Sequence, residues 1–233
     1  MASIDYQLVR SSRRKTISLQ VKHGQVRVLA PEFVNEQYIA ELVVKKRAWL
    51  QQKIALQQQS SETVERQYQH DEVFYYLGKP YRLSVVVASK NSVSIEAEHI
   101  VVAVKVANDD PALIANAVKK QLHAWYKQQA MSILLARSEQ WQQDTKLKAK
   151  CSTVRYFKSR WGSCDSKGHV KLNWLLVMAP DWVIDYVIIH ELCHLKHMNH
   201  SAEFWALVSS FYGNHKVAKT WLTQHQSHLY WIN

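Results

Sequence analysis

The residues best suited to chemistry form a short run near the C-terminal end, His190-Glu191-Leu192-Cys193-His194. Two histidines four positions apart lie about 40° from each other around a helix, so they can bind one ion together. Glu191 lies about 100° from His190 around such a helix, near the ion without having to bind it. This spacing predicts a zinc site at His190 and His194, with Glu191 placed to take a proton from water.

A third metal ligand is expected downstream, because a catalytic zinc ion usually has three protein ligands and an open position. The candidates are His197, His200 and Glu203. We favour His200, which reaches the ion only where the helix ends first. Met198-Asn199 suits such an end, since asparagine tolerates the left-handed conformation, and Ser201 can then cap a new helix. Glu203 and His197 are the alternatives.

The helix that carries the pair is predicted from Asp181 to about His197, beginning after Pro180. It is apolar on nearly every side, which is typical of a helix buried in a protein interior. Two imidazoles and a carboxylate in such surroundings need polar partners. Burial therefore favours a metal site over two isolated core histidines.

A second block with chemical potential is Ser159-Arg-Trp-Gly-Ser-Cys164. Glycine would let a substrate backbone approach closely, and arginine can stabilise an oxyanion or a phosphate. An extended peptide could dock here by strand addition. The residues that we assign to substrate binding are Arg160, Trp161, Gly162 and Ser163. The alternative is packing, with Trp161 on the buried helix and Cys164 as a core thiol. Tyr156, Tyr186 and Tyr212 are candidate oxyanion donors among which the sequence does not choose.

Two strand-and-helix segments precede this region. Alternating apolar residues predict strands at 17–21 and 26–28, then one helix capped by Asn35 and reaching Ile54. Strands are predicted again between residues 73 and 106, followed by a helix from Pro111, capped by Asp110, to about Gln142. Two further strands are expected at 153–157 and 169–172.

Composition excludes several classes of protein. The 233 residues are 47% hydrophobic and 21% charged, as in folded globular proteins. No secretory signal is expected, because the opening residues contain no apolar stretch and Asp5 interrupts them. No membrane span is expected, because the most apolar stretch, 172–189, contains Asn173, Pro180, Asp181 and Asp185. Three cysteines suit a reducing compartment, so we expect a cytoplasmic protein.

The chain is basic, with 30 Lys and Arg against 19 Asp and Glu and a formal net charge of +11. This balance favours anionic partners such as nucleotides or nucleic acid. The basic residues cluster at Arg10, Arg13, Arg14 and Lys15, and again at Arg155, Lys158 and Arg160. The alternative for these clusters is a solvated surface that protects sheet edges from aggregation.

The sequence resembles the YgjP-like metal-dependent hydrolases, which are related to the SprT-like zincin metallopeptidases. The motifs that carry the resemblance are Lys158–Cys164, Lys171-Leu-Asn173, Tyr186–Leu195 and His200-x-x-x-Phe-Trp205, with an N-terminal pattern at Ser12–Leu19 and Ala30-Pro31. It spans about residues 8–230. The resemblance implies His190, His194 and His200 as metal ligands and Glu191 as the catalytic carboxylate.

We therefore expect an α+β fold, with a strand-rich N-terminal lobe at 1–108 and a zincin-like catalytic lobe at 109–233. The expected function is that of a zinc-dependent metallopeptidase, in which Glu191 acts as general base on a metal-activated water. Zn²⁺ is the expected cofactor, with another divalent ion as the alternative. The alternative functions are a nucleoside-triphosphate pyrophosphohydrolase, a DNA-associated SprT-like protease and a metal-binding module without enzymatic activity.

Overall fold

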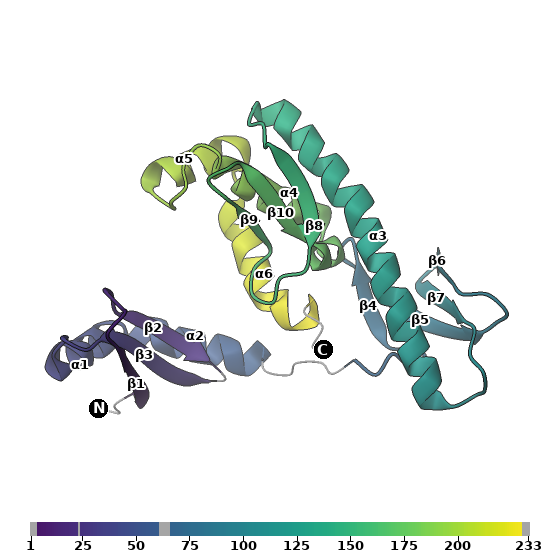
Figure 1. The fold of residues 1–233 in the computed structure, drawn as a ribbon, viewed down its shortest axis with the longest axis horizontal. Helices are drawn as coiled ribbons and strands as arrows, with labels where there is room; N and C mark the ends of the chain where they lie inside the picture. The colour runs from purple at the N-terminus through teal and green to yellow at the C-terminus, as the bar shows by residue number, and fades with distance from the viewer. Residues whose placement is uncertain (1–3, 23, 61–65, 230–233) are drawn as a thin grey trace. The chain divides into compact units, whose positions relative to one another are not determined.

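The computed structural model describes residues 4–22, 24–60 and 66–229. The chain forms two compact units, Met1–Val64 and Glu65–Asn233, each with its own hydrophobic core (Figure 1). The boundary thus differs from the predicted division at 108–109. The reason is that the apolar residues of the strands between 73 and 104 pack into the same core as the helix that follows them. Both units combine strands and helices, which confirms the α+β class.

The described residues of the first unit form one three-stranded sheet and two helices. The strands lie in the order β1-β3-β2, with β1 parallel and β2 antiparallel to β3. Their bounds are β1 Tyr6–Ser11, β2 Ser18–Lys22 and β3 Gln25–Pro31, followed by α1 Glu36–Lys45 and α2 Arg47–Ser60. Asn35 caps α1 by accepting a hydrogen bond from the Gln37 amide, as predicted. The single helix predicted here is two, because Lys46 leaves the helical conformation.

Arg10 has a structural role in this unit. Its Nη1 atom donates hydrogen bonds to the carbonyl oxygens of Pro31, Glu32 and Val34. Its other terminal nitrogen, Nη2, lies 3.6 Å from a carboxylate oxygen of Glu36. This member of the basic N-terminal cluster therefore holds the connection between β3 and α1.

The part of the second unit that the structure describes has two further sheets and one long helix that packs on both. The strand orders are β4-β5-β7-β6 and β8-β10-β9. The bounds are β4 Val73–Tyr76, β5 Lys79–Val87, β6 Ser92–Glu96, β7 His99–Val104, β8 Cys151–Arg155, β9 Gly162–Cys164 and β10 His169–Asn173. Helix α3, Pro111–Thr145, contacts β7 of the four-stranded sheet and β8 of the three-stranded sheet of this unit (Figure 1). Asp110 caps α3 through the Ala112 amide, which confirms that prediction.

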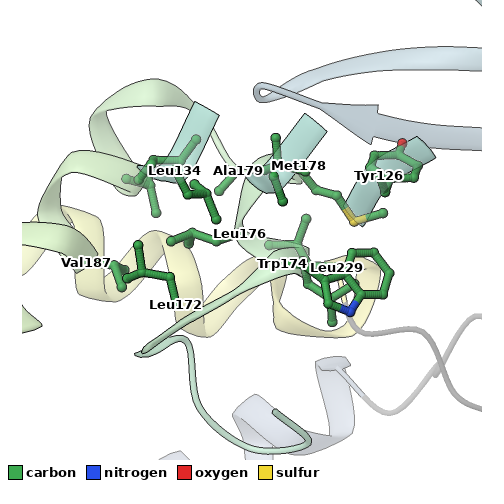
Figure 2. Packing of buried hydrophobic residues seen from close by; sticks show 14 of the residues in the cluster. Tyr126, Leu134, Leu172, Trp174, Leu176, Met178, Ala179, Val187 and Leu229 are labelled. Atoms are coloured by element: carbon green, nitrogen blue, oxygen red, sulfur yellow. The ribbon is translucent and has the colours of Figure 1, made fainter. Parts of the chain in front are cut away.

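The remaining elements surround the predicted buried helix. They are the 3₁₀ helix η1 Trp174–Met178 and the helices α4 Asp181–Cys193, α5 Ala202–Phe211 and α6 His215–Leu229. Helix α4 lies inside the larger core, and Figure 2 shows its Val187 among side chains such as Leu172 of β10 and Leu134 of α3. The prediction of a helix buried on nearly every side is confirmed. Among the described helices, none is long and apolar enough to cross a membrane.

The start of α4 is fixed by the hairpin between β4 and β5. The amides of Leu77 and Gly78 donate hydrogen bonds to the carbonyls of Val177 and Met178, at 2.9 and 3.0 Å. Gly78 has φ +78°, and a Cβ atom there would lie 2.6 Å from Cγ of Pro180. The hairpin can approach α4 this closely only because residue 78 has no side chain.

Gly78→Ala is therefore expected to lower the free energy of unfolding by about 3 kcal/mol, from the positive φ and from the clash with Pro180. Gly168→Ala is the matched control, because φ is +79° there but the nearest neighbouring atom would lie 3.5 Å from the new Cβ. It should lose about 1 kcal/mol, the backbone penalty alone. Urea unfolding of the two variants measures the difference, and equal losses would contradict this packing.

Candidate functional site

Three histidines meet at the C-terminal end of α4. His190 lies in the last turn of the helix, His194 is its C-cap residue, and His200 lies just before α5. Their potential ligand nitrogens all lie within 4.8 Å of one another. The Nε2 atoms of His190 and His200 are 3.1 Å apart. Two nitrogens bound to one tetrahedral zinc ion at 2.0–2.1 Å are separated by about 3.3 Å, so this spacing fits a shared ion.

The chain turns back towards α4 because this helix ends early. It ends at Cys193, four residues before the predicted end near His197. The amides of Leu195 and Lys196 then donate to the carbonyls of Leu192 and Cys193, which closes a tight turn. Ser201 begins α5 as predicted, its hydroxyl accepting a hydrogen bond from the Phe204 amide. This break brings His200 beside the other two histidines.

The two alternative ligands lie outside the cluster. His197 contributes its backbone carbonyl, which accepts a hydrogen bond from Nδ1 of His194 at 2.9 Å. That bond fixes the tautomer of His194 and leaves its Nε2 atom for an ion. Glu203 is exposed on α5, and its hydrogen bond with Ser201 lowers the pKa of its carboxyl group.

The surroundings of the histidines keep His190 in its metal-binding form. Burial, and next the charges of His194 and His200, lower the pKa of His190 to about 3. The ring is therefore neutral at pH 7, as a metal ligand must be. Phe204 packs on His190 and His194, with its ring centroid 4.9 Å from that of His190 and 4.5 Å from that of His194. The Phe and Trp that follow His200 in the sequence thus pack on the cluster from α5.

Glu191 is buried next to β9. Its residue exposure is 6%, and burial raises the pKa of its carboxyl group to about 8, opposed by the positive charge of Arg160. A Cβ atom at Gly162 would lie 2.7 Å from both Cγ and Oε1 of Glu191. The glycine that the sequence assigned to substrate approach therefore also makes room for this carboxylate.

The cluster and β9 line one cavity of about 550 Å³. Every site residue that the sequence predicted lies in its wall, namely Arg160, Trp161, Gly162, Ser163, His190, Glu191, His194 and His200. Sequence reasoning missed the contribution of α6, whose Lys219, Thr223 and Gln226 also line the cavity. Their spacing of i, i+4 and i+7 marks one face of a helix, but no motif accompanies it.

Asn173 organises the loop that leads into β9. Its fully buried side chain donates from Nδ2 to the carbonyls of Phe157 and Arg160. Its backbone amide donates to the Trp161 carbonyl at 2.8 Å. These three bonds shape the segment that forms the cavity wall, which gives a physical role to one residue of the family motif.

The structure separates the remaining candidates. Tyr186 lines the cavity, and burial raises its pKa to about 12, so its hydroxyl stays protonated. Tyr212 instead donates to the Trp182 carbonyl. Cys164 is partly buried: it packs against the larger core, as in the packing alternative, and it also lines the cavity. Cys193 is fully buried in the core.

Comparison with known proteins identifies one family. The family described as YgjP-like, metallopeptidase domain, matches residues 15–225. Among solved structures, the chain is similar to the crystal structure of the metallopeptidase zymogen of Pyrococcus abyssi abylysin. The two are 22% identical, with a TM-score of 0.37, and the match covers 40% of this chain and 96% of the other. No curated protein matches the chain.

Replacing any of the three clustered histidines with asparagine is expected to abolish stoichiometric zinc binding. The loss in zinc affinity should exceed the roughly 10–100-fold loss that follows removal of a group hydrogen-bonded to a metal ligand. His197→Asn is the matched control, because residue 197 contributes only a backbone carbonyl and should still bind zinc. Metal analysis of the dialysed proteins measures both. Zinc retained without His200, or lost without the His197 side chain, would contradict this ligand set.

Proposed function

Because the chain belongs to the YgjP-like metallopeptidase family, we propose that it is a zinc-dependent peptidase in which His190, His194 and His200 hold the ion. Glu191 is the general base, and the substrate is a polypeptide. The observation that carries this proposal is the convergence of three imidazoles and a buried carboxylate on one cavity. An open cavity beside three ligands is typical of a catalytic zinc site, since structural sites are closed by four protein ligands.

When bound, a zinc ion supplies Lewis acidity and lowers the pKa of water towards neutrality. The protein's own residues contribute by moving a proton. Burial alone favours the protonated form of Glu191, whereas a cation bound beside it would favour the ionised form. In that form a carboxylate oxygen of Glu191 accepts the proton of the attacking water and then delivers it to the nitrogen of the leaving amine. The buried position of Glu191 limits its contact with bulk water. Tyr186 also lines the cavity, and in this proposal its hydroxyl donates to the developing oxyanion.

The polypeptide binds along β9 in this proposal. β9 lies at the end of its sheet, paired with β10 on one side, and no described strand pairs with its other side. An extended peptide can add to such an edge through main-chain hydrogen bonds. Arg160, Trp161, Gly162 and Ser163 would then contact the substrate, because all four line the cavity.

Glu191→Gln tests the proposed function directly. The zinc-loaded parent protein is expected to cleave an unfolded protein such as casein, and the variant should lose about 10²–10⁴-fold in rate with its zinc retained. Nucleoside triphosphates are assayed in parallel. Undiminished cleavage by the variant would contradict the role of Glu191. Release of phosphate or pyrophosphate without any peptide cleavage would instead favour the nucleotide alternative.

Gly162→Ala is expected to lower peptidase activity by about 10²-fold, because the new methyl group displaces the Glu191 carboxylate by a distance that matters for proton transfer. Zinc content should not change. Gly213→Ala serves as control, since a Cβ atom there meets no atom within 4 Å. If the Gly162 variant keeps full activity, the contact between β9 and Glu191 does not position the base.

A further inference from the structure

Lys219 stands between two hollows on the surface of the second unit. It lines the cavity that holds the histidines and Glu191. It also lines a neighbouring hollow of about 460 Å³, together with Trp205, Ser209, His215 and Lys216. A peptide bound at the first cavity can therefore place one of its side chains in the second hollow and meet Lys219 on the way.

Ring contacts place the Lys219 ammonium near the histidine cluster. Its Nζ atom lies 5.5 Å from the centroid of the Trp205 ring. That ring lies 5.7 Å, between centroids, from both His190 and His200. Trp205 also stacks on His215 at 5.2 Å, so the floor of the hollow is a pair of packed rings.

The ion pairs of the described residues leave Lys219 without a carboxylate partner. Glu191 is the one acidic residue in the described wall of the cavity that holds the histidines. Arg160 is a second cation in that wall, beside Lys219. The described wall of the second hollow contains Lys216 and no acidic residue. A concave surface lined by charges of one sign concentrates ligands of the opposite sign.

The hollow also contains groups suited to a carboxylate with a short apolar stem. The Ser209 hydroxyl and Nδ1 of His215 are hydrogen-bonded at 3.3 Å. With Nδ1 as the donor of that bond, the Ser209 hydroxyl can donate to a carboxylate that pairs with the ammonium. The Trp205 ring offers an apolar surface to methylene groups. Glutamate combines these two features, whereas a lysine side chain would meet two cations.

We propose that this hollow is a substrate subsite for an acidic side chain near the scissile bond, with Lys219 as the residue that pairs with its carboxylate. The proposal builds on the peptidase function proposed above and adds a specificity. It makes acidic polypeptides the preferred substrate class of this basic protein.

Binding to the zinc-loaded Glu191→Gln protein tests the subsite without requiring cleavage. Fluorescent peptides with blocked termini carry either Glu or Gln at one of the three positions on each side of a central bond. For at least one position, the Glu peptide should bind about fivefold more tightly, the range of a partly exposed ion pair. This preference should shrink at about 0.5 M salt, because screening weakens exposed pairs.

Three further substitutions, each made in the Glu191→Gln protein, assign the preference to one residue. Lys219→Gln should abolish it, and Lys219→Arg should retain it. Lys90→Gln is the matched control, because it removes the same charge from an exposed position outside both hollows and should leave the preference unchanged.

Equal binding of the Glu and Gln peptides at every position would overturn the proposal, as would a preference that survives Lys219→Gln. The results also distinguish a failure of the subsite from a failure of the proposed peptidase function. A Lys219-dependent binding preference in a protein whose parent cleaves no peptide supports the subsite and contradicts the peptidase. Cleavage by the parent protein without any preference for acidic peptides supports the peptidase function and contradicts the subsite.

Discussion

Helix α4 and its C-cap residue place two imidazoles and a carboxylate at the edge of an apolar core, where buried polar groups need partners. The end of α4 at Cys193 meets this need, because the turn that follows brings His200 back to the same place. Had the helix continued, His200 would lie about 120° from His194 around its axis. The rest of the site depends on this one break in a buried helix, since it turns a pair of histidines into a cluster of three.

In the proposed function the opposite requirement acts on Glu191, which would lie near the ion but remain free to exchange a proton. Its place is set by close packing, because Gly162 leaves room for its carboxylate and a methyl group would not fit. Asn173 fixes the segment that leads to Gly162 through bonds to three backbone carbonyls. Gly162 and Asn173, two residues of the family motifs, are thus explained as packing around one buried carboxylate.

The spacing of His190, Glu191 and His194 was sufficient to predict that these side chains share one cavity wall, because it depends only on helical geometry. The caps at Asn35, Asp110 and Ser201 were predictable for the same reason, as each is a local hydrogen bond. Strand β1 was not predicted, and β9 was anticipated only in the expectation that a peptide could dock there by strand addition, without its bounds. β9 is three residues long and is set by pairing with β10, so its own sequence carries no periodic signal. The role of α6 depends on tertiary packing alone.

X-ray absorption spectroscopy of the zinc-loaded protein tests the central claim most directly, because it reports the atoms bound to the ion. Three histidine ligands and an open position predict nitrogen or oxygen neighbours alone, at about 2.0–2.1 Å, with the multiple scattering of three imidazoles. A sulfur neighbour at about 2.3 Å would contradict the account. It would mean that Cys164 or Cys193 has replaced a histidine and that the turn after α4 does not build the site.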